Sequence, residues 1–279
     1  MASKKFPNAA PLHKKILFQT VYRWTASWRR KPDFIIIGVQ KGGTSSLFRY
    51  LEQHPDTKMP YRKQLHFFDR SFNKGLRFYQ QAFPLSMFSK GKITGEATPF
   101  YVFHPRVAER MHQVLPDVKL ILMLRNPIDR AYSHYQMKKD QGWEDAETFE
   151  EALGKEKVRL ATELAKMEAD PNYYSKIYRN FGYLSRGNYA EQLEKWLKYF
   201  PKEQILILES EEFFSKPMDS LERVYAFLGM KSFRPPSLKA FNSREYDPLD
   251  PALREKLQNH FRPYNEKLAK MLDWPIDWK

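Results

Sequence analysis

A short glycine-rich segment carries the residues best suited to bind an anion. Gln40-Lys41-Gly42-Gly43-Thr44-Ser45-Ser46 follows an apolar run and precedes a helical pattern. Such a turn gathers backbone N–H groups and the positive end of the helix dipole at one point. Lys41 adds a full charge and the three hydroxyls add donors, so we predict a phosphate site without a metal. The lysine precedes the glycines, unlike G-x-x-x-x-G-K-[ST], which disfavours a kinase or ATPase.

Arg125 is a second candidate anion contact. It follows the apolar run 118–124, and Pro127 favours a helix start two residues later. A guanidinium can pair bidentately with phosphate, and the N–H groups of the helix start face the same way. The alternative is a pairing of Arg125 with a carboxylate such as Asp129 or Glu96.

Together these motifs resemble those of sulfotransferases that use 3′-phosphoadenosine 5′-phosphosulfate (PAPS), particularly the heparan sulfate sulfotransferase group and its bacterial relatives. Residues 33–47 look like the family's 5′-phosphosulfate loop, and residues 124–135 are similar to its 3′-phosphate motif. Further similar segments are 63–69, 95–101 and 186–189. The resemblance implies that Lys41 stabilises the leaving phosphate, with PAP as the product. It implies donor contacts from Lys41, Gly42, Gly43, Thr44, Ser45, Ser46, Arg125, Ser133 and Arg186.

The resemblance also locates the catalytic segment, with one departure. In the heparan sulfate group the glutamate of Lys-Glu-x-His-Phe-Phe-Asp is the base, whereas this sequence has Gln64 there. A neutral amide does not usefully remove a proton. His66 is one candidate base, since its unperturbed pKa of about 6.5 suits the task. The alternatives are an engineered Glu-to-Gln change, natural loss of activity, an acceptor amine with its lone pair free, and a purely structural histidine.

Other residues of these segments are candidate acceptor contacts. An extended chain at 64–68 would turn Gln64 and His66 to the same face, where both could reach one acceptor. Asp69 is a substrate contact or a salt-bridge partner of Arg70 or Lys63. Glu96 orients the acceptor or Lys41, or balances a cation. A basic rim suits an acidic polysaccharide, unless these are ordinary solvated cations: Lys63, Arg70, Lys74, Arg77, Lys138 and Lys139. Without cysteine the family's C-terminal disulfide loop cannot form, and we expect Asn242, Ser243 and Arg244 in part of its role.

The elements that must position these residues alternate along the chain. Runs rich in β-branched and apolar residues predict strands at 34–39, 118–124 and 204–208. Helical spacing predicts helices at 45–51, 127–139, 147–167 and 189–200, and residues 231–251 are expected to be irregular. This order predicts an α/β fold, and the resemblance makes it a three-layer P-loop-like fold with a central parallel sheet flanked by helices.

Composition limits the remaining choices. The 279 residues carry a net charge of +14 and no cysteine, which favours an anionic partner and excludes disulfides and thiolate chemistry. We expect a basic arm or helix at 1–31 that packs on the domain or lies on a membrane surface, and one domain at 32–279. No signal peptide is recognised, which favours a cytoplasmic location. The other functions considered are a P-loop kinase and a silent PAP/PAPS- or polyanion-binding protein, and the absence of a recognition motif disfavours nucleic acid.

Overall fold

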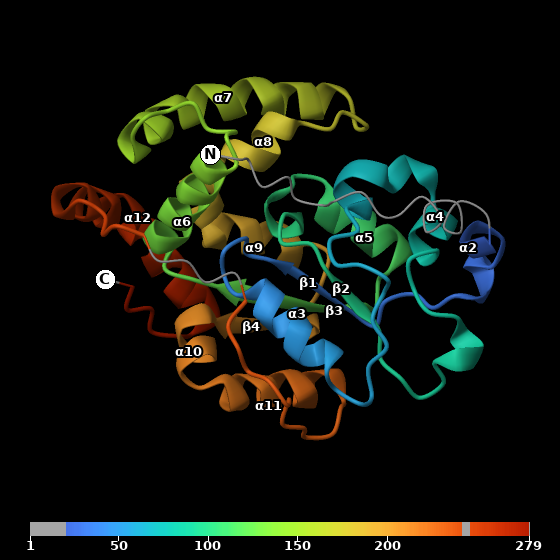
Figure 1. Ribbon diagram of the computed structural model, residues 1–279. Helices are drawn as coiled ribbons and strands as arrows, with labels where there is room; N and C mark the ends of the chain where they lie inside the picture. The colour runs from blue at the N-terminus through green and yellow to red at the C-terminus, as the bar shows by residue number, and fades with distance from the viewer. Residues whose placement is uncertain (1–20, 242–245, 279) are drawn as a thin grey trace, which may run out of the picture.

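The computed structural model describes residues 21–241 and 246–278 and is built on one parallel sheet. Its strands are β1 (Phe34–Gly38), β2 (Gly95–Ala97), β3 (Lys119–Leu124) and β4 (Ile205–Glu209), in the order β2-β1-β3-β4 (Figure 1). After β1 the chain forms β2 on one side of β1, and it then returns to form β3 on the other side of β1. Ligands of open α/β sheets bind beyond the carboxyl ends of the strands at such a switch point, here between β1 and β3.

Two hydrophobic cores cover the two faces of the sheet, because successive side chains of a strand point to opposite faces. Ile35 and Ile37 belong to one core, and Phe34 and Ile36 belong to the other. The first face is covered by α4 (Leu76–Gln80), α5 (Val107–Val114), α9 (Tyr189–Leu197) and the end of α12 (Pro251–Leu272). The second is covered by α3 (Thr44–Glu52), α10 (Ser210–Ser215) and α11 (Pro217–Leu228). The predicted three-layer α/β fold is thereby confirmed.

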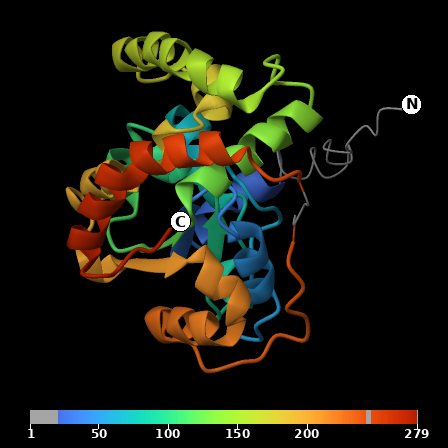
Figure 2. The same cartoon turned by 90° about the vertical axis from the view of Figure 1, so that its left-hand side faces the viewer.

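A helical layer lies beyond the end of β3. α6 (Pro127–Asp140), α7 (Phe149–Ala169) and α8 (Lys176–Phe181) follow one another, and α12 packs against both α6 and α9 (Figure 2). Thr148 begins α7 with a side-chain cap that accepts from the Glu151 N–H, and Asp250 caps α12 in the same way through the Leu253 N–H. These helices form one wall beside the carboxyl ends of the strands.

The remaining described elements are short. Before β1 lie α2 (Val21–Trp24) and the 3-10 turn η1 (Ala26–Trp28). Between α3 and β3 lie a π-helical turn at η2 (Phe67–Ser71) and 3-10 turns at η3 (Phe72–Lys74), η4 (Ser86–Phe88) and η5 (Tyr101–Phe103). Further 3-10 turns are η6 (Ser185–Gly187) and η7 (Lys202–Gln204). No helix in the described ranges is long and apolar enough to cross a bilayer.

The predicted strands and helices are found within one to three residues of their expected bounds. Strand β2 was not predicted, because three residues are too short for a periodic pattern. Residues 231–241 and 246–250 form neither helix nor strand, as expected.

Candidate functional site

The phosphate loop joins β1 to α3, and both of its glycines are required by space or conformation. A Cβ on Gly42 would lie 2.9 Å from Val39 Cγ2 and 3.0 Å from the Met123 carbonyl oxygen. Gly43 has φ 86°, a left-handed value that side chains disfavour, and it begins α3 as the N-cap. The start of α3 therefore points its first-turn N–H groups at the end of the sheet.

The second predicted motif lies directly beside this loop. Arg125 follows β3, and its Nη1 donates to the Lys41 carbonyl oxygen at 2.9 Å across 84 residues of sequence. The hydroxyl of Tyr189 donates to the Arg125 carbonyl at 2.8 Å and fixes its backbone. Asn126 caps α6 by accepting from the Ile128 N–H, so this helix too begins at the switch point. Asp129 pairs with Arg254 instead, and Glu96 accepts from the Tyr79 hydroxyl, so the expected alternative partners of Arg125 are engaged elsewhere.

Arg186 ties the loop to the helical wall. This buried side chain donates from Nη1 to Gln40 Oε1 and from Nη2 to the Arg179 carbonyl. Its guanidinium lies 4.9 Å and 5.1 Å from the ring centroids of Phe100 and Phe103. Burial, with Arg130 nearby, lowers the pKa of Arg186 to about 9.

Arg186 belongs to a buried cluster of basic groups that we call the cationic cluster: Arg130, His134, Lys138 and Arg186. The first three lie at i, i+4 and i+8 on one face of α6. Burial and then Arg186 lower the pKa of Lys138 to about 7 and hold that of His134 well below its usual value. Several of the cluster's buried nitrogens have no hydrogen-bond partner: Nε and Nη1 of Arg130, Nε of Arg186 and both ring nitrogens of His134. Buried donors without partners are unfavourable, and an anion bound beside them would supply acceptors.

The cluster was only partly anticipated. Arg186 and Lys138 were expected near the site from the sequence, whereas Arg130 and His134 were not. Arg130 and His134 lie four residues apart within the 3′-phosphate motif, and this spacing could have indicated that they share one face of a helix. Helical spacing alone does not say which face is buried. Ser133 immediately precedes His134 on α6 and is buried. Its hydroxyl lies 3.5 Å from the hydroxyl of Tyr246.

The segment at 63–69 is not extended, which overturns that expectation. Gln64 and His66 have left-handed φ values of 62° and 52°, and η2 begins at Phe67. Phe67 and Phe68, the first two residues of η2, are both buried. Side chains accept the hydrogen bonds of backbone N–H groups in this turn. The Leu65 N–H donates to Glu96 Oε2, and the Phe67 N–H donates to the Tyr101 hydroxyl. Gln64 remains exposed, with its N–H bonded to the Ala97 carbonyl.

His66 has a partner on each ring nitrogen. Nδ1 lies 2.8 Å from Asp69 Oδ2, and Nε2 lies 2.9 Å from Nη2 of Arg179 on α8. Asp69 is buried and pairs with His66 rather than with Arg70 or Lys63 as predicted, because the turn at η2 brings positions 66 and 69 together. A carboxylate at Nδ1 and an arginine donor at Nε2 favour the tautomer with its hydrogen on Nδ1. His66 is thus bonded to side chains and not to a backbone carbonyl.

Lys63 links this segment to the phosphate loop. Its Nζ donates to Ser45 Oγ at 2.6 Å, and burial, aided by Arg49, lowers its pKa to about 7. Ser46 is engaged differently, because its buried hydroxyl accepts from the Phe241 N–H and so holds the chain after α11 against the loop. Asn242, Ser243 and Arg244, expected near this point, lie outside the described residues.

Glu96 holds the segment 63–69 in place through hydrogen bonds. The fully buried carboxylate accepts hydrogen bonds from the hydroxyls of Tyr79, Thr98 and Tyr101 at 2.9, 2.7 and 3.0 Å. Burial raises its pKa in spite of these donors. With the Leu65 N–H, these contacts account for Glu96 as a positioning residue for the turn.

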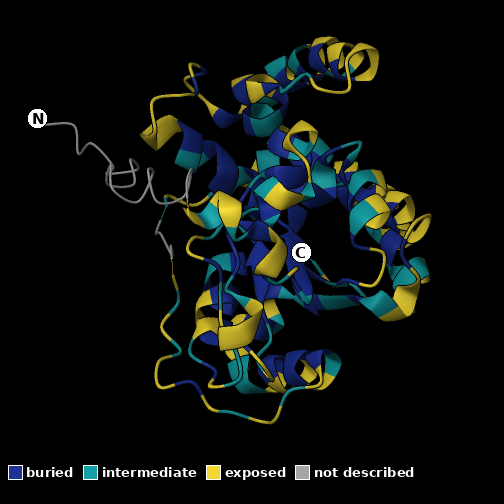
Figure 3. Ribbon diagram, turned by 90° about the vertical axis from the view of Figure 1, so that its right-hand side faces the viewer, coloured by how far each residue is buried: buried dark blue, intermediate teal, exposed yellow. Residues whose placement is uncertain are grey.

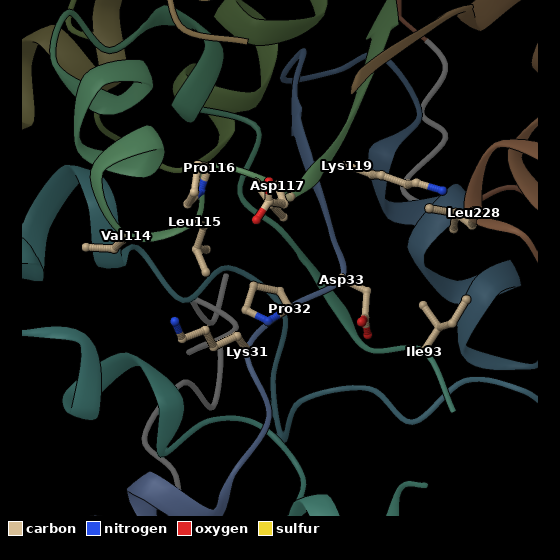
Figure 4. Close-up of a pocket in the computed structure, with 11 residues that line it drawn as sticks. Lys31, Pro32, Asp33, Ile93, Val114, Leu115, Pro116, Asp117, Lys119 and Leu228 are labelled. Atoms are coloured by element: carbon tan, nitrogen blue, oxygen red, sulfur yellow. The ribbon is translucent and has the colours of Figure 1, made fainter. Parts of the chain in front are cut away.

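A pocket of about 420 Å³ opens at the opposite end of the sheet (Figure 4). Its lining comes from the segments that lead into β1 and β3, and it includes Asp33, Asp117 and Lys119. Asp33 is bonded to Arg30 and to the Thr94 N–H, and Lys119 Nζ donates to the Phe227 carbonyl. These polar groups hold the fold together, so we place the candidate site at the carboxyl ends. In the described ranges no three potential metal-ligating His, Cys, Asp or Glu side chains gather.

Comparisons of sequence and of structure both find sulfotransferases. Residues 31–243 match the family profile described as Sulfotransferase domain. Heparan sulfate glucosamine 3-O-sulfotransferase 6 of Mus musculus is 30% identical over 90% of this chain and 74% of its own length. Membrane-associated sulfotransferase kil1 of Dictyostelium discoideum is 28% identical over 89% of this chain and 66% of its own. The crystal structure of a sulfotransferase from Alicyclobacillus acidocaldarius, 32% identical, superposes with a TM-score of 0.68 over 88% of this chain and 98% of that one.

Proposed function

Because the chain belongs to the sulfotransferase domain family, we propose that it transfers a sulfuryl group from PAPS to a hydroxyl or amine of a saccharide. One observation carries the site assignment. Two motifs far apart in sequence, the loop at 40–46 and Arg125, contact each other at the switch point of the sheet. PAPS supplies the sulfuryl group and leaves as PAP.

The donor site suits a molecule with several negative charges. Lys41 and the start of α3 are suited to the 5′-phosphosulfate, and Arg125 with Ser133 to the 3′-phosphate. The cationic cluster supports this fit, because its buried nitrogens lack partners that an anion would provide. Lys63, bonded to Ser45, adds a second cation beside the loop. Lys41 is the residue that we assign to the charge developing on the leaving phosphate.

We assign the proton transfer to His66. Asp69 accepts from Nδ1 and so leaves the lone pair of Nε2 as the proton acceptor. Arg179 now donates to that nitrogen, so an acceptor hydroxyl must take its place before the proton is removed. Gln64, exposed at the same turn, can then bind the acceptor through its amide.

A saccharide acceptor is favoured by charge and by the relatives. The mouse relative acts, by its name, on heparan sulfate glucosamine. Arg179 would be released when the acceptor binds, and a displaced guanidinium beside an acidic saccharide gains a new partner. Lys63, Arg70 and Lys74 lie in or next to the turn that carries His66.

A PAP-binding protein without transfer activity is the second candidate, because Gln64 is not a base and Arg179 engages His66 Nε2. A transfer assay from radiolabelled PAPS to a panel of desulfated and sulfated saccharides separates the two. The parent and Gln64→Glu are compared with His66→Asn. Transfer by the parent that is lost in His66→Asn supports the proposal. Transfer only by Gln64→Glu supports the silent binder, and transfer by His66→Asn at the parent's rate removes the assignment of His66.

A further inference from the structure

The most exposed apolar side chains gather near the amino ends of the strands. In the described ranges, four of the five most exposed large hydrophobic residues come from two segments, α2–η1 and η4. They are Trp24 at 85%, Met87 at 76%, Trp28 at 69% and Phe88 at 65%. Large exposed apolar groups that lie together mark interaction surfaces, whereas scattered ones need no explanation.

The first segment shows an apolar stripe that faces away from the core. Val21 and Trp24 lie one turn apart at the two ends of α2, Trp28 ends η1, and all three are exposed. Ala26 and Arg29 point inward, and Arg29 Nη1 donates to the Phe83 carbonyl at 2.7 Å. α2 itself has no buried residue, so the fold covers none of its apolar side chains.

The second segment is held beside the first by backbone contacts. Arg29 and Leu85 form an isolated antiparallel bridge, and the Arg30 N–H donates to the Pro84 carbonyl at 3.0 Å. Met87 and Phe88 follow immediately. We call the five exposed apolar residues the apolar patch: Val21, Trp24, Trp28, Met87 and Phe88. Figure 3 turns towards the viewer the side of the molecule that carries α2.

Basic side chains surround the apolar patch, and two nearby acidic side chains are paired within the fold. Arg23, Lys31, Lys58 and Lys90 are exposed around it, and Lys58 Nζ donates to the Phe88 carbonyl. Asp33 is paired with Arg30 at 2.8 Å and Asp56 with Lys92 at 3.8 Å. The surface therefore presents tryptophans inside a positive border, the combination that favours the interface of an anionic bilayer.

We propose that the apolar patch docks the protein on an anionic membrane surface. Tryptophan and phenylalanine side chains enter the boundary between headgroups and acyl chains, and the basic border meets the headgroup charge. The patch lies towards the amino ends of the strands, whereas the phosphate loop lies at their carboxyl ends (Figure 1). Docking in this orientation leaves the donor and acceptor sites facing away from the bilayer.

Vesicle flotation of the full chain tests the proposal. The parent is expected to float with phosphatidylglycerol vesicles, more weakly at high salt, and not with phosphatidylcholine vesicles. Trp24→Ser with Trp28→Ser, and separately Met87→Ser with Phe88→Ser, should each lower the partition coefficient by about tenfold or more, since each pair removes much of the buried apolar area. Trp143→Ser is the matched control, because Trp143 is 52% exposed but lies outside the patch, and it should change partition less than about twofold.

Three results would overturn the proposal. In the first, the parent fails to float with anionic vesicles. In the second, both double variants float like the parent, which would assign binding to residues before the patch. In the third, the parent is a dimer without vesicles and the double variants are monomers, which would make the patch a contact between two copies. Thermal midpoints and PAP affinity that match the parent establish that the variants are folded, because the substituted side chains are exposed and distant from the donor loop.

Discussion

The donor half and the acceptor half of the proposed site are built by different means. The donor half consists of the ends of regular elements, where β1 meets α3 and β3 meets α6, and its two loops contact each other through Arg125 and Lys41. The acceptor half is a left-handed turn at 64–66 held by side chains, chiefly Glu96 and Tyr101. The position of the donor is therefore set by the sheet. The chemistry at the acceptor depends on a few replaceable hydrogen bonds.

The largest effect is expected from Lys41→Ala, which removes the cation assigned to the leaving phosphate. Loss of one such electrostatic contact costs about 10²–10³ in kcat. The measurement is single-turnover transfer at saturating PAPS, with Lys195→Ala on the outer face of α9 as the control. A kcat for Lys41→Ala within a factor of about three of the parent would remove Lys41 from this role.

On the acceptor half, His66→Asn and Asp69→Asn should lower kcat by about 10², the lower end of general-base contributions, while PAP affinity stays at the parent's value. The reason is that both residues act on the acceptor's proton, whereas the donor contacts lie in the other half. Equilibrium binding of PAP and steady-state transfer are measured on the same samples. A parallel loss of PAP affinity in both variants would show that the two halves are not separable.

Backbone packing in the donor half predicts a smaller effect on stability. Gly42→Ala forces a Cβ against Val39 and the Met123 carbonyl, and overpacking of this kind costs about 1–3 kcal/mol. Gly154→Ala is the matched change, because nothing lies within 4 Å of its Cβ in the interior of α7. It should gain about 0.5–1 kcal/mol. Thermal unfolding of both variants checks this, and equal shifts of the midpoint would contradict the packing argument.

The smallest expected effects depend on the protonation of Lys63, first in the stability of the fold and then in the binding of the donor. The pKa of Lys63 is about 7 in the folded protein and higher in the unfolded chain, so the unfolded chain binds more protons between these values. Burying charged Lys63 therefore destabilises the fold most below pH about 7, and the cost falls as pH rises towards the unfolded pKa of about 10.4. Lys63→Met should stabilise the protein at about pH 6, with an advantage that shrinks as pH rises.

An anion beside Lys63 raises its pKa, so PAP binding at about pH 8 should take up a proton. Calorimetry in two buffers of different ionisation enthalpy measures this uptake. Lys63→Met should reduce it, and Lys138→Met should reduce it as well, because the pKa of Lys138 is also about 7. No proton uptake by the parent would place both lysines away from the donor.

The contrast between the halves also explains what the sequence could predict. The strand at 34–38, the loop at 40–46 and the helix start at Pro127 follow from local patterns, and sheet topology then brings Arg125 to the loop. The turn at 64–66 could not be predicted, because its conformation is set by long-range partners, with Glu96 and Tyr101 accepting its N–H groups. The pairing of Asp69 with His66 depends on that turn. Arg130 and His134 were missed because their burial comes from the wall formed by α8 and η6.

The most direct test of the account compares the affinities of PAP and AMP, which differ by the 3′-phosphate, for the parent and for Arg125→Ala. We expect the parent to bind PAP without magnesium and to bind AMP at least about tenfold more weakly, since a charge-assisted bidentate contact is lost. Arg125→Ala should reduce that preference to nearly one. Equal binding of PAP and AMP by the parent, or an unchanged preference in Arg125→Ala, would contradict the assignment of the donor site.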